Sequence, residues 1–131
     1  QILSNPLTPF IGKFVSQNNL VEVKTKDGNL STNYGTILVK SHLFKEKPNT
    51  LMFDESSLNI KLNSNGNAVV TGKEFRDSYW ILSIESGNDN LRISLTLDRE
   101  INIGDRCNLT FISGKYGTLY PGCISCILTT S

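Results

Sequence analysis

Alanine is nearly missing from this sequence, in which Ala68 is the only one among 131 residues. Alanine is the strongest helix former. Its place is taken by Asn, Ser, Thr and Gly, which disfavour helices because they compete for backbone hydrogen bonds or lose more conformational entropy. We therefore predict an all-β protein that is built from short strands and tight turns.

Histidine is equally scarce, since His42 is the only one in the chain. A catalytic or metal site that depends on imidazole would have to use this single side chain. The sequence also contains no nucleophile elbow of the form Gly-x-Ser-x-Gly and no phosphate-binding glycine loop. We therefore expect no catalytic residues, no metal site and no cofactor, and we predict that the protein is not an enzyme.

The chain has three cysteines, and this odd number does not suit a fully oxidised disulfide framework. Cys123 and Cys126 have the C-x-x-C spacing, but on a strand residues three apart point to opposite faces. Cys107 and Cys126 each share a strand face with apolar neighbours. We expect these two thiols to be buried and unpaired, with a disulfide between Cys107 and Cys126 as the alternative.

Strong net charge and long apolar runs are absent as well. The formal net charge is only +1 at pH 7, whereas nucleic-acid-binding domains usually carry a pronounced basic face. No apolar run approaches the roughly 18 residues that a membrane-spanning helix requires. We expect neither a nucleic-acid partner nor membrane insertion, and we interpret the densest basic stretch as a solvated loop, which contains Lys40, His42, Lys45 and Lys47.

The first residues differ from the rest because Pro6 and Pro9 lie close together there. Proline biases the preceding residue towards extended backbone. We predict that residues 1–14 form an extended N-terminal arm or edge strand and that residues 15–131 form a β-sandwich domain. Because the chain begins with Gln1 rather than Met, we expect that it was processed or cut from a longer protein.

Apolar and polar residues alternate in several runs, most clearly in residues 91–98. A period of two is the pattern of a half-buried strand. The regular spacing predicts about eight or nine antiparallel strands in a single-domain β-sandwich or jelly roll, with a small β-barrel as the alternative. The main expected strands cover residues 20–25, 36–44, 57–62, 68–71, 79–85, 91–98, 107–112 and 123–129.

Turn residues separate these runs. Asp27-Gly28 and residues 86–90 predict tight hairpin turns, and residues 63–67 predict a hairpin between the runs on either side of them. We also expect residues 114–117 to form a loop. The inward faces of the expected strands predict a buried core that contains Leu58, Ile60, Trp80, Leu82, Leu91, Ile93, Leu95, Leu109 and Phe111.

Loops that are rich in Asn, Ser and Gly and that carry tyrosines are typical of recognition surfaces. Tyr116 and Tyr120 flank the last expected turn, and Tyr34 lies in a polar loop. Sugar rings stack on such aromatic side chains, while amide side chains bond to sugar hydroxyls. These three tyrosines are therefore candidate glycan-binding residues.

Three classes of function agree with these features. The first is a non-enzymatic attachment or assembly module, such as a virus or phage particle head or decoration domain, or an adhesin subunit of a surface fibre. The alternatives are a monomeric carbohydrate-binding domain and a small β-fold enzyme or inhibitor. We expect protein subunits or a cell-surface glycan or receptor as partners, a homo-oligomer, and an extracellular, cell-surface or virion location.

Overall fold

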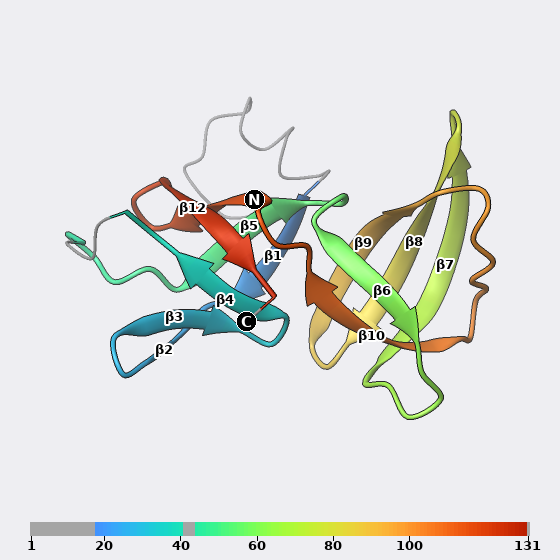
Figure 1. Cartoon of the computed structure of the whole chain (residues 1–131), viewed down its shortest axis with the longest axis horizontal. Coiled ribbons are helices and arrows are strands. Elements are labelled where there is room, and N and C mark those ends of the chain that lie inside the picture. Colours follow the sequence, from blue (N-terminus) through green and yellow to red (C-terminus); the bar gives the residue numbers. More distant parts are fainter. Residues whose placement is uncertain (1–17, 41–43, 131) are drawn as a thin grey trace.

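The computed structural model describes residues 18–40 and 44–130 and contains twelve antiparallel strands in two sheets (Figure 1). The prediction of an all-β fold is confirmed, whereas the predicted number of eight or nine strands is too low. The N-terminal arm predicted for residues 1–14 and the lone His42 lie outside the described residues.

The two sheets lie side by side along the long axis of the molecule (Figure 1). The seven-stranded sheet contains, in spatial order, β1 (Asn18–Glu22), β5 (Thr50–Asp54), β11 (Tyr116–Tyr120), β12 (Ile124–Thr129), β4 (Gly35–Leu38), β3 (Asn29–Thr32) and β2 (Lys24–Lys26). The five-stranded sheet contains β6 (Leu58–Leu62), β10 (Arg106–Phe111), β7 (Ala68–Arg76), β8 (Tyr79–Ser86) and β9 (Asp89–Leu95).

The seven-stranded sheet is curled into a nearly closed, barrel-like shape. Its edge strands β1 and β2 lie at opposite ends of the strand order, yet Val23 alone separates them along the chain. The two edges must therefore approach each other, and the sheet curves around its own buried side chains. The Val23 amide donates a 2.9 Å hydrogen bond to the Asn49 carbonyl, which ties this crossing to the segment before β5.

Three strands of this sheet, β3, β5 and β11, were not predicted. In β5 the alternating signal is present, because Leu51 and Phe53 are buried on one face. In β11 the signal is hidden by Gly117, which occupies an inward position. A Cβ atom at Gly117 would lie 2.8 Å from Leu51 Cδ1 and 3.1 Å from the Met52 carbonyl oxygen, so the lack of a side chain leaves room for Leu51 and for the neighbouring strand β5. The expected loop through Gly117 is therefore wrong.

The hairpin predicted at residues 63–67 is also wrong. Strands β6 and β7 do not pair with each other, because β10 lies between them and pairs with both. The connecting segment instead crosses the first residues of β10. At this crossing a Cβ atom on Gly66 would collide with the Cys107 carbonyl oxygen. The glycine that suggested a turn in the sequence serves a close backbone crossing.

The core joins both sheets. Eight of the nine predicted core side chains are buried, and the ninth, Trp80, is half-buried and packs against the core. Phe111 contacts Phe53 edge to face with ring centroids 5.3 Å apart. Cys107 and Cys126 are both buried and lie in different sheets, and all three cysteines are free. Burial raises the pKa of the Cys126 thiol to about 11.

Polar groups of Asn19 on β1 and of Glu55, which follows β5, complete the edge strand β9. The Asn19 amide nitrogen donates a 2.9 Å hydrogen bond to the Arg92 carbonyl, and its oxygen accepts a 2.7 Å bond from the Arg92 amide. Two residues further along, the Ser94 amide donates to the Glu55 carbonyl at 2.9 Å. These bonds satisfy backbone groups that an edge strand otherwise leaves open.

Replacing Asn19 by alanine should leave both backbone polar groups of Arg92 without these partners. We expect a loss of about 3 kcal/mol in the free energy of unfolding, because unsatisfied buried polar groups are costly. Chemical denaturation measures this loss. The matched control is Asn59→Ala on an exposed position of β6, and similar stability of the two variants would contradict this role of Asn19.

Replacing Gly66 by alanine should force β10 and the crossing segment apart. We expect this overpacking to lower the free energy of unfolding by about 2–3 kcal/mol. At Gly114, where φ is +94° and a Cβ atom would meet no other atom within 4 Å, alanine adds backbone strain alone. Gly114→Ala should therefore cost about 1 kcal/mol in the same denaturation measurement. An equal cost at the two positions would show that the crossing is not tight.

Candidate functional site

A polar cleft of about 900 Å³ opens where the two sheets meet. Its walls come from five segments: the end of β1, the β3–β4 turn, the start of β7 with the residue before it, the β8–β9 turn and the middle of β10. Four asparagines from four of these segments line the cleft, and all four are exposed: Asn33, Asn67, Asn88 and Asn108.

Tight turns place two of these asparagines. In the β8–β9 hairpin, Ser86 pairs with Asp89, and Gly87 and Asn88 form the two-residue connection. Gly87 has a φ of +59°, which suits the first central position of a type II′ turn and which glycine adopts without steric cost. This predicted hairpin is confirmed, and its turn presents Asn88 to the cleft.

The β3–β4 turn carries Asn33 and Tyr34 between Thr32 and Gly35. The Tyr34 amide donates a 3.0 Å hydrogen bond to the Thr32 hydroxyl, which stabilises the turn. At Gly35, φ is +149° and a Cβ atom would collide with the Thr129 carbonyl oxygen. Glycine at this position lets β4 approach β12 closely enough to hold the turn against the core.

A hydrogen bond across the cleft joins the two turns. The Tyr34 hydroxyl donates to Asp89 Oδ2 at 2.5 Å, linking the β3–β4 turn of one sheet to the β8–β9 turn of the other. Tyr34 is only 4% exposed, and its ring packs edge to face against Phe111. Burial, and then the hydrogen bond to Asp89, raise the pKa of the Tyr34 phenol well above its ordinary value.

The charge of the cleft is of one sign. Glu22 and Asp89 are its ionisable carboxylates, and its lining residues contain no lysine, arginine or histidine. Each asparagine amide offers two donor hydrogens and an acceptor oxygen. Val21, Ala68 and Leu109 add short apolar stretches to the wall. Such a lining complements an uncharged ligand that has many hydroxyl groups and some exposed C–H surface.

The three candidate tyrosines do not meet in one site. Tyr34 lines the cleft, but its ring is buried and offers no open face for stacking. Tyr116 is 70% exposed on β11, and Tyr120 is half-buried on the same outward face of that strand. Burial, and then the neighbouring Cys123, raise the pKa of Tyr120.

The sequence did not identify these four asparagines as site residues, because asparagine is also a common turn residue. Their spacing along the chain carries no regular motif, and they converge only when the ends of both sheets are brought together. The one available signal is the overall excess of asparagine in the loops, which favours polar recognition in general and does not indicate a location.

Within residues 18–40 and 44–130, no group of three or more histidine, cysteine, aspartate or glutamate side chains is arranged to hold a metal ion. No helix in the same stretches has the length and apolar character needed to cross a membrane.

No protein-family model matches the chain, and no curated protein and no solved structure shows significant similarity to it.

Replacing Tyr34 by phenylalanine should remove the bond between the two turns. Because the folded state raises the pKa of this phenol, its stabilising effect is fully present below about pH 10 and is lost as pH rises further. We expect Tyr34→Phe to lower the free energy of unfolding by about 1–2 kcal/mol at neutral pH. In this variant the free energy of unfolding should also fall less as pH rises above about 10 than it does in the wild type.

Urea denaturation between neutral pH and pH 11 measures both effects. Tyr116→Phe is the matched control, because that ring is exposed on the outer face of β11. The assignment of this alkaline loss of stability to Tyr34 would be contradicted if the free energy of unfolding fell at high pH as much in Tyr34→Phe as in the wild type, but less in Tyr116→Phe.

Proposed function

We propose that the protein is a non-enzymatic attachment module that binds an uncharged carbohydrate in the cleft between its two sheets. The observation that carries this proposal is the convergence of four exposed asparagines on one polar cleft. Sugar hydroxyls both donate and accept hydrogen bonds, and amide side chains supply both kinds of partner in the same group.

The size and rigidity of the cleft support a small saccharide as its ligand. A volume of about 900 Å³ is within the range of sites that take small molecules. The bond between Tyr34 and Asp89 connects two of the walls before any ligand arrives. A wall that is already ordered reduces the conformational entropy that binding must remove.

The charge of the cleft favours neutral sugars over anionic ones. An anionic sugar would approach Glu22 and Asp89 with no basic side chain among the lining residues to compensate. The half-buried Asp89 is engaged with Tyr34, so its carboxylate supports the wall.

The architecture is compatible with attachment as the purpose of binding. In β-sandwich and jelly-roll modules, recognition residues sit on loops at the ends of a rigid sheet scaffold, and three walls of this cleft lie at such ends. We extend the proposal to a module of a virus or phage particle or of a surface fibre, with a cell-surface glycan as partner and an extracellular, cell-surface or virion location.

Replacing Asn88 or Asn108 by alanine should weaken glycan binding by roughly tenfold each, because each change removes about one to two hydrogen bonds to the ligand. A panel of neutral and anionic glycans identifies a ligand, and titration calorimetry then measures its affinity for each variant. Asn59→Ala is the matched control, since Asn59 is an exposed asparagine on β6 outside the cleft.

The outer face of β11 is the competing location for a glycan site. Tyr116→Ala combined with Tyr120→Ala should leave binding unchanged if the cleft is the site. Loss of binding in this double variant, together with full binding in Asn88→Ala and Asn108→Ala, would move the site to the exposed tyrosines. The absence of any glycan ligand would overturn the proposed function itself.

A further inference from the structure

Two exposed side chains of opposite charge flank the crossing from β1 to β2, next to the cleft. Glu22 ends β1 and lines the cleft, Val23 is buried, and Lys24 begins β2. The ion pairs among the described residues both involve Glu74, so neither Glu22 nor Lys24 takes part in one of them.

The two carboxylates that line the cleft differ in their surroundings. Asp89 is half-buried, and its Oδ2 accepts the 2.5 Å hydrogen bond from the Tyr34 hydroxyl that joins the two turns. Glu22 is exposed, and its carboxylate faces no such partner among the hydrogen bonds of the described side chains. Glu22 is therefore the carboxylate of the cleft that can meet a ligand directly.

Lys24 acts on the cleft through Asn33. Its ammonium donates a 3.0 Å hydrogen bond to Asn33 Oδ1. Because an ammonium group can only donate, the amide oxygen of Asn33 is the atom that faces Lys24, and the two hydrogens of the amide nitrogen remain for another partner. Asn33 thus offers the cleft a donor, whereas the ionised Glu22 offers only acceptors.

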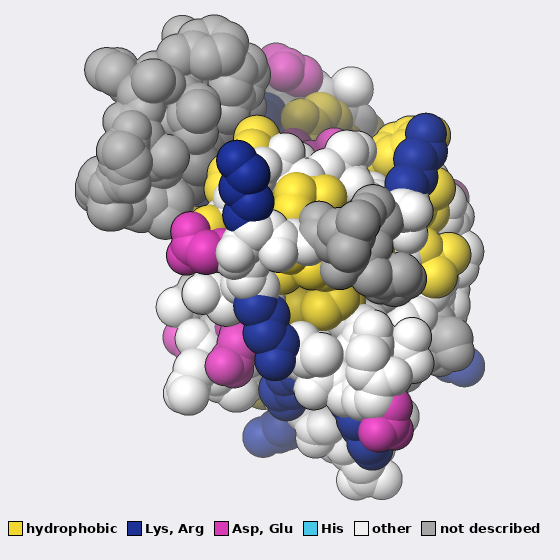
Figure 2. Space-filling model, turned by 90° about the vertical axis from the view of Figure 1, so that its left-hand side faces the viewer, with side chains coloured by type: hydrophobic (Ala, Val, Ile, Leu, Met, Phe, Trp, Pro, Cys, Tyr) yellow, Lys and Arg dark blue, Asp and Glu magenta, His cyan; other side chains and the backbone are white. Residues whose placement is uncertain are grey.

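The single sign of charge in the cleft is a local feature of the surface. Figure 2 shows basic and acidic side chains interspersed on the end of the molecule that the seven-stranded sheet forms. The cleft lining, in contrast, contains Glu22 and Asp89 without a basic residue, and Lys24 reaches it through the bond to Asn33.

We propose that Glu22 determines which charge of glycan the cleft accepts. Its carboxylate accepts hydrogen bonds from the hydroxyls of a neutral sugar and repels a sugar that carries a carboxylate or a sulfate. Asp89 has a different role, because its bond to Tyr34 supports the wall. This inference rests on the proposed carbohydrate site and assigns its specificity to one residue.

The chemistry of the two partners explains both halves of this role. A hydrogen bond from a hydroxyl to an ionised carboxylate is stronger than one between neutral groups. The same charge repels an anionic group, and the repulsion grows in a cleft where less water separates the charges. A neutral sugar can donate to Glu22 while one of its oxygens accepts from Asn33, whereas an anionic group at this wall has no directly facing cation.

Paired glycans test the role of Glu22 in the full chain. The probes are neutral saccharides on an array and the same saccharides with a carboxylate or sulfate in place of one hydroxyl. The wild type should bind the neutral member of a pair roughly tenfold more tightly than the anionic member. Glu22→Gln should reduce this ratio to about threefold or less, and Glu22→Lys should reverse it, because Lys24 is then joined by a second cation.

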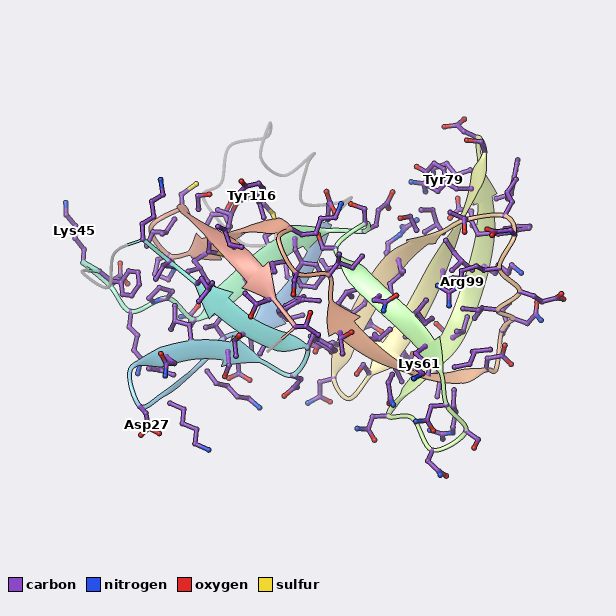
Figure 3. All side chains as sticks on the ribbon, in the orientation of Figure 1. Asp27, Lys45, Lys61, Tyr79, Arg99 and Tyr116 are labelled. Atoms are coloured by element: carbon purple, nitrogen blue, oxygen red, sulfur yellow. The ribbon has the colours of Figure 1, made fainter. Side chains whose placement is uncertain are left out.

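Asp27→Asn is the matched control, since it also converts an exposed carboxylate of the same sheet to an amide. Figure 3 shows Asp27 at the tip of the β2–β3 hairpin, which points away from the five-stranded sheet, and Asp27 does not line the cleft. This variant should keep the tenfold ratio. High salt should lower the ratio of the wild type, because salt screens exposed charges.

Two failures can be told apart. If the wild type binds neutral saccharides but both Glu22 variants keep its ratio, the role of Glu22 is overturned and the carbohydrate site stands. An equal change of the ratio in Asp27→Asn would also overturn that role, because a general effect of surface charge would then explain it. If the wild type binds no saccharide of either kind, the proposed function falls and this inference falls with it.

Discussion

The Asn19 side chain forms two hydrogen bonds to the backbone of Arg92, and these bonds extend the five-stranded sheet with a group from the seven-stranded sheet. Because the amide mimics a peptide unit, it satisfies the open edge of β9 as a further strand would. The hydrogen bond from the Ser94 amide to the Glu55 carbonyl adds a further contact along the same edge of β9. The relative position of the two sheets, and hence the shape of the cleft between them, depends on these hydrogen bonds from Asn19 and Glu55 to β9.

The cleft shows how a rigid scaffold holds a site made of turn residues. Its turns are short because glycine or a hydroxyl hydrogen bond stabilises each one, and the Tyr34–Asp89 bond then connects the two sheets on the side of the cleft. Polar groups of Asn88 and Asn108 remain exposed above an apolar floor. A surface that is ordered, polar and without basic groups is suited to neutral hydroxylated ligands.

Sequence reasoning succeeded where a local pattern determined the structure. The alternation in residues 91–98 identifies β9 and its buried face, although the strand ends at Leu95 and Leu97 is exposed. It failed where the partner of a residue is distant in sequence. Gly66 and Gly117 look like turn residues, but each allows a close approach to another strand. Tyr34 looks like a loop aromatic, but it is buried against Phe111.

The sequence by itself determined the all-β class, the Asp27-Gly28 turn, the β8–β9 hairpin and part of the core, because strand periodicity and turn preferences are properties of neighbouring residues. Only the tertiary structure decided that β10 separates β6 from β7 and that the seven-stranded sheet curls. It also decided which asparagines share a cleft. These features depend on which distant segments bury each other's apolar faces and satisfy each other's backbone groups, and such pairings leave no signature in local sequence.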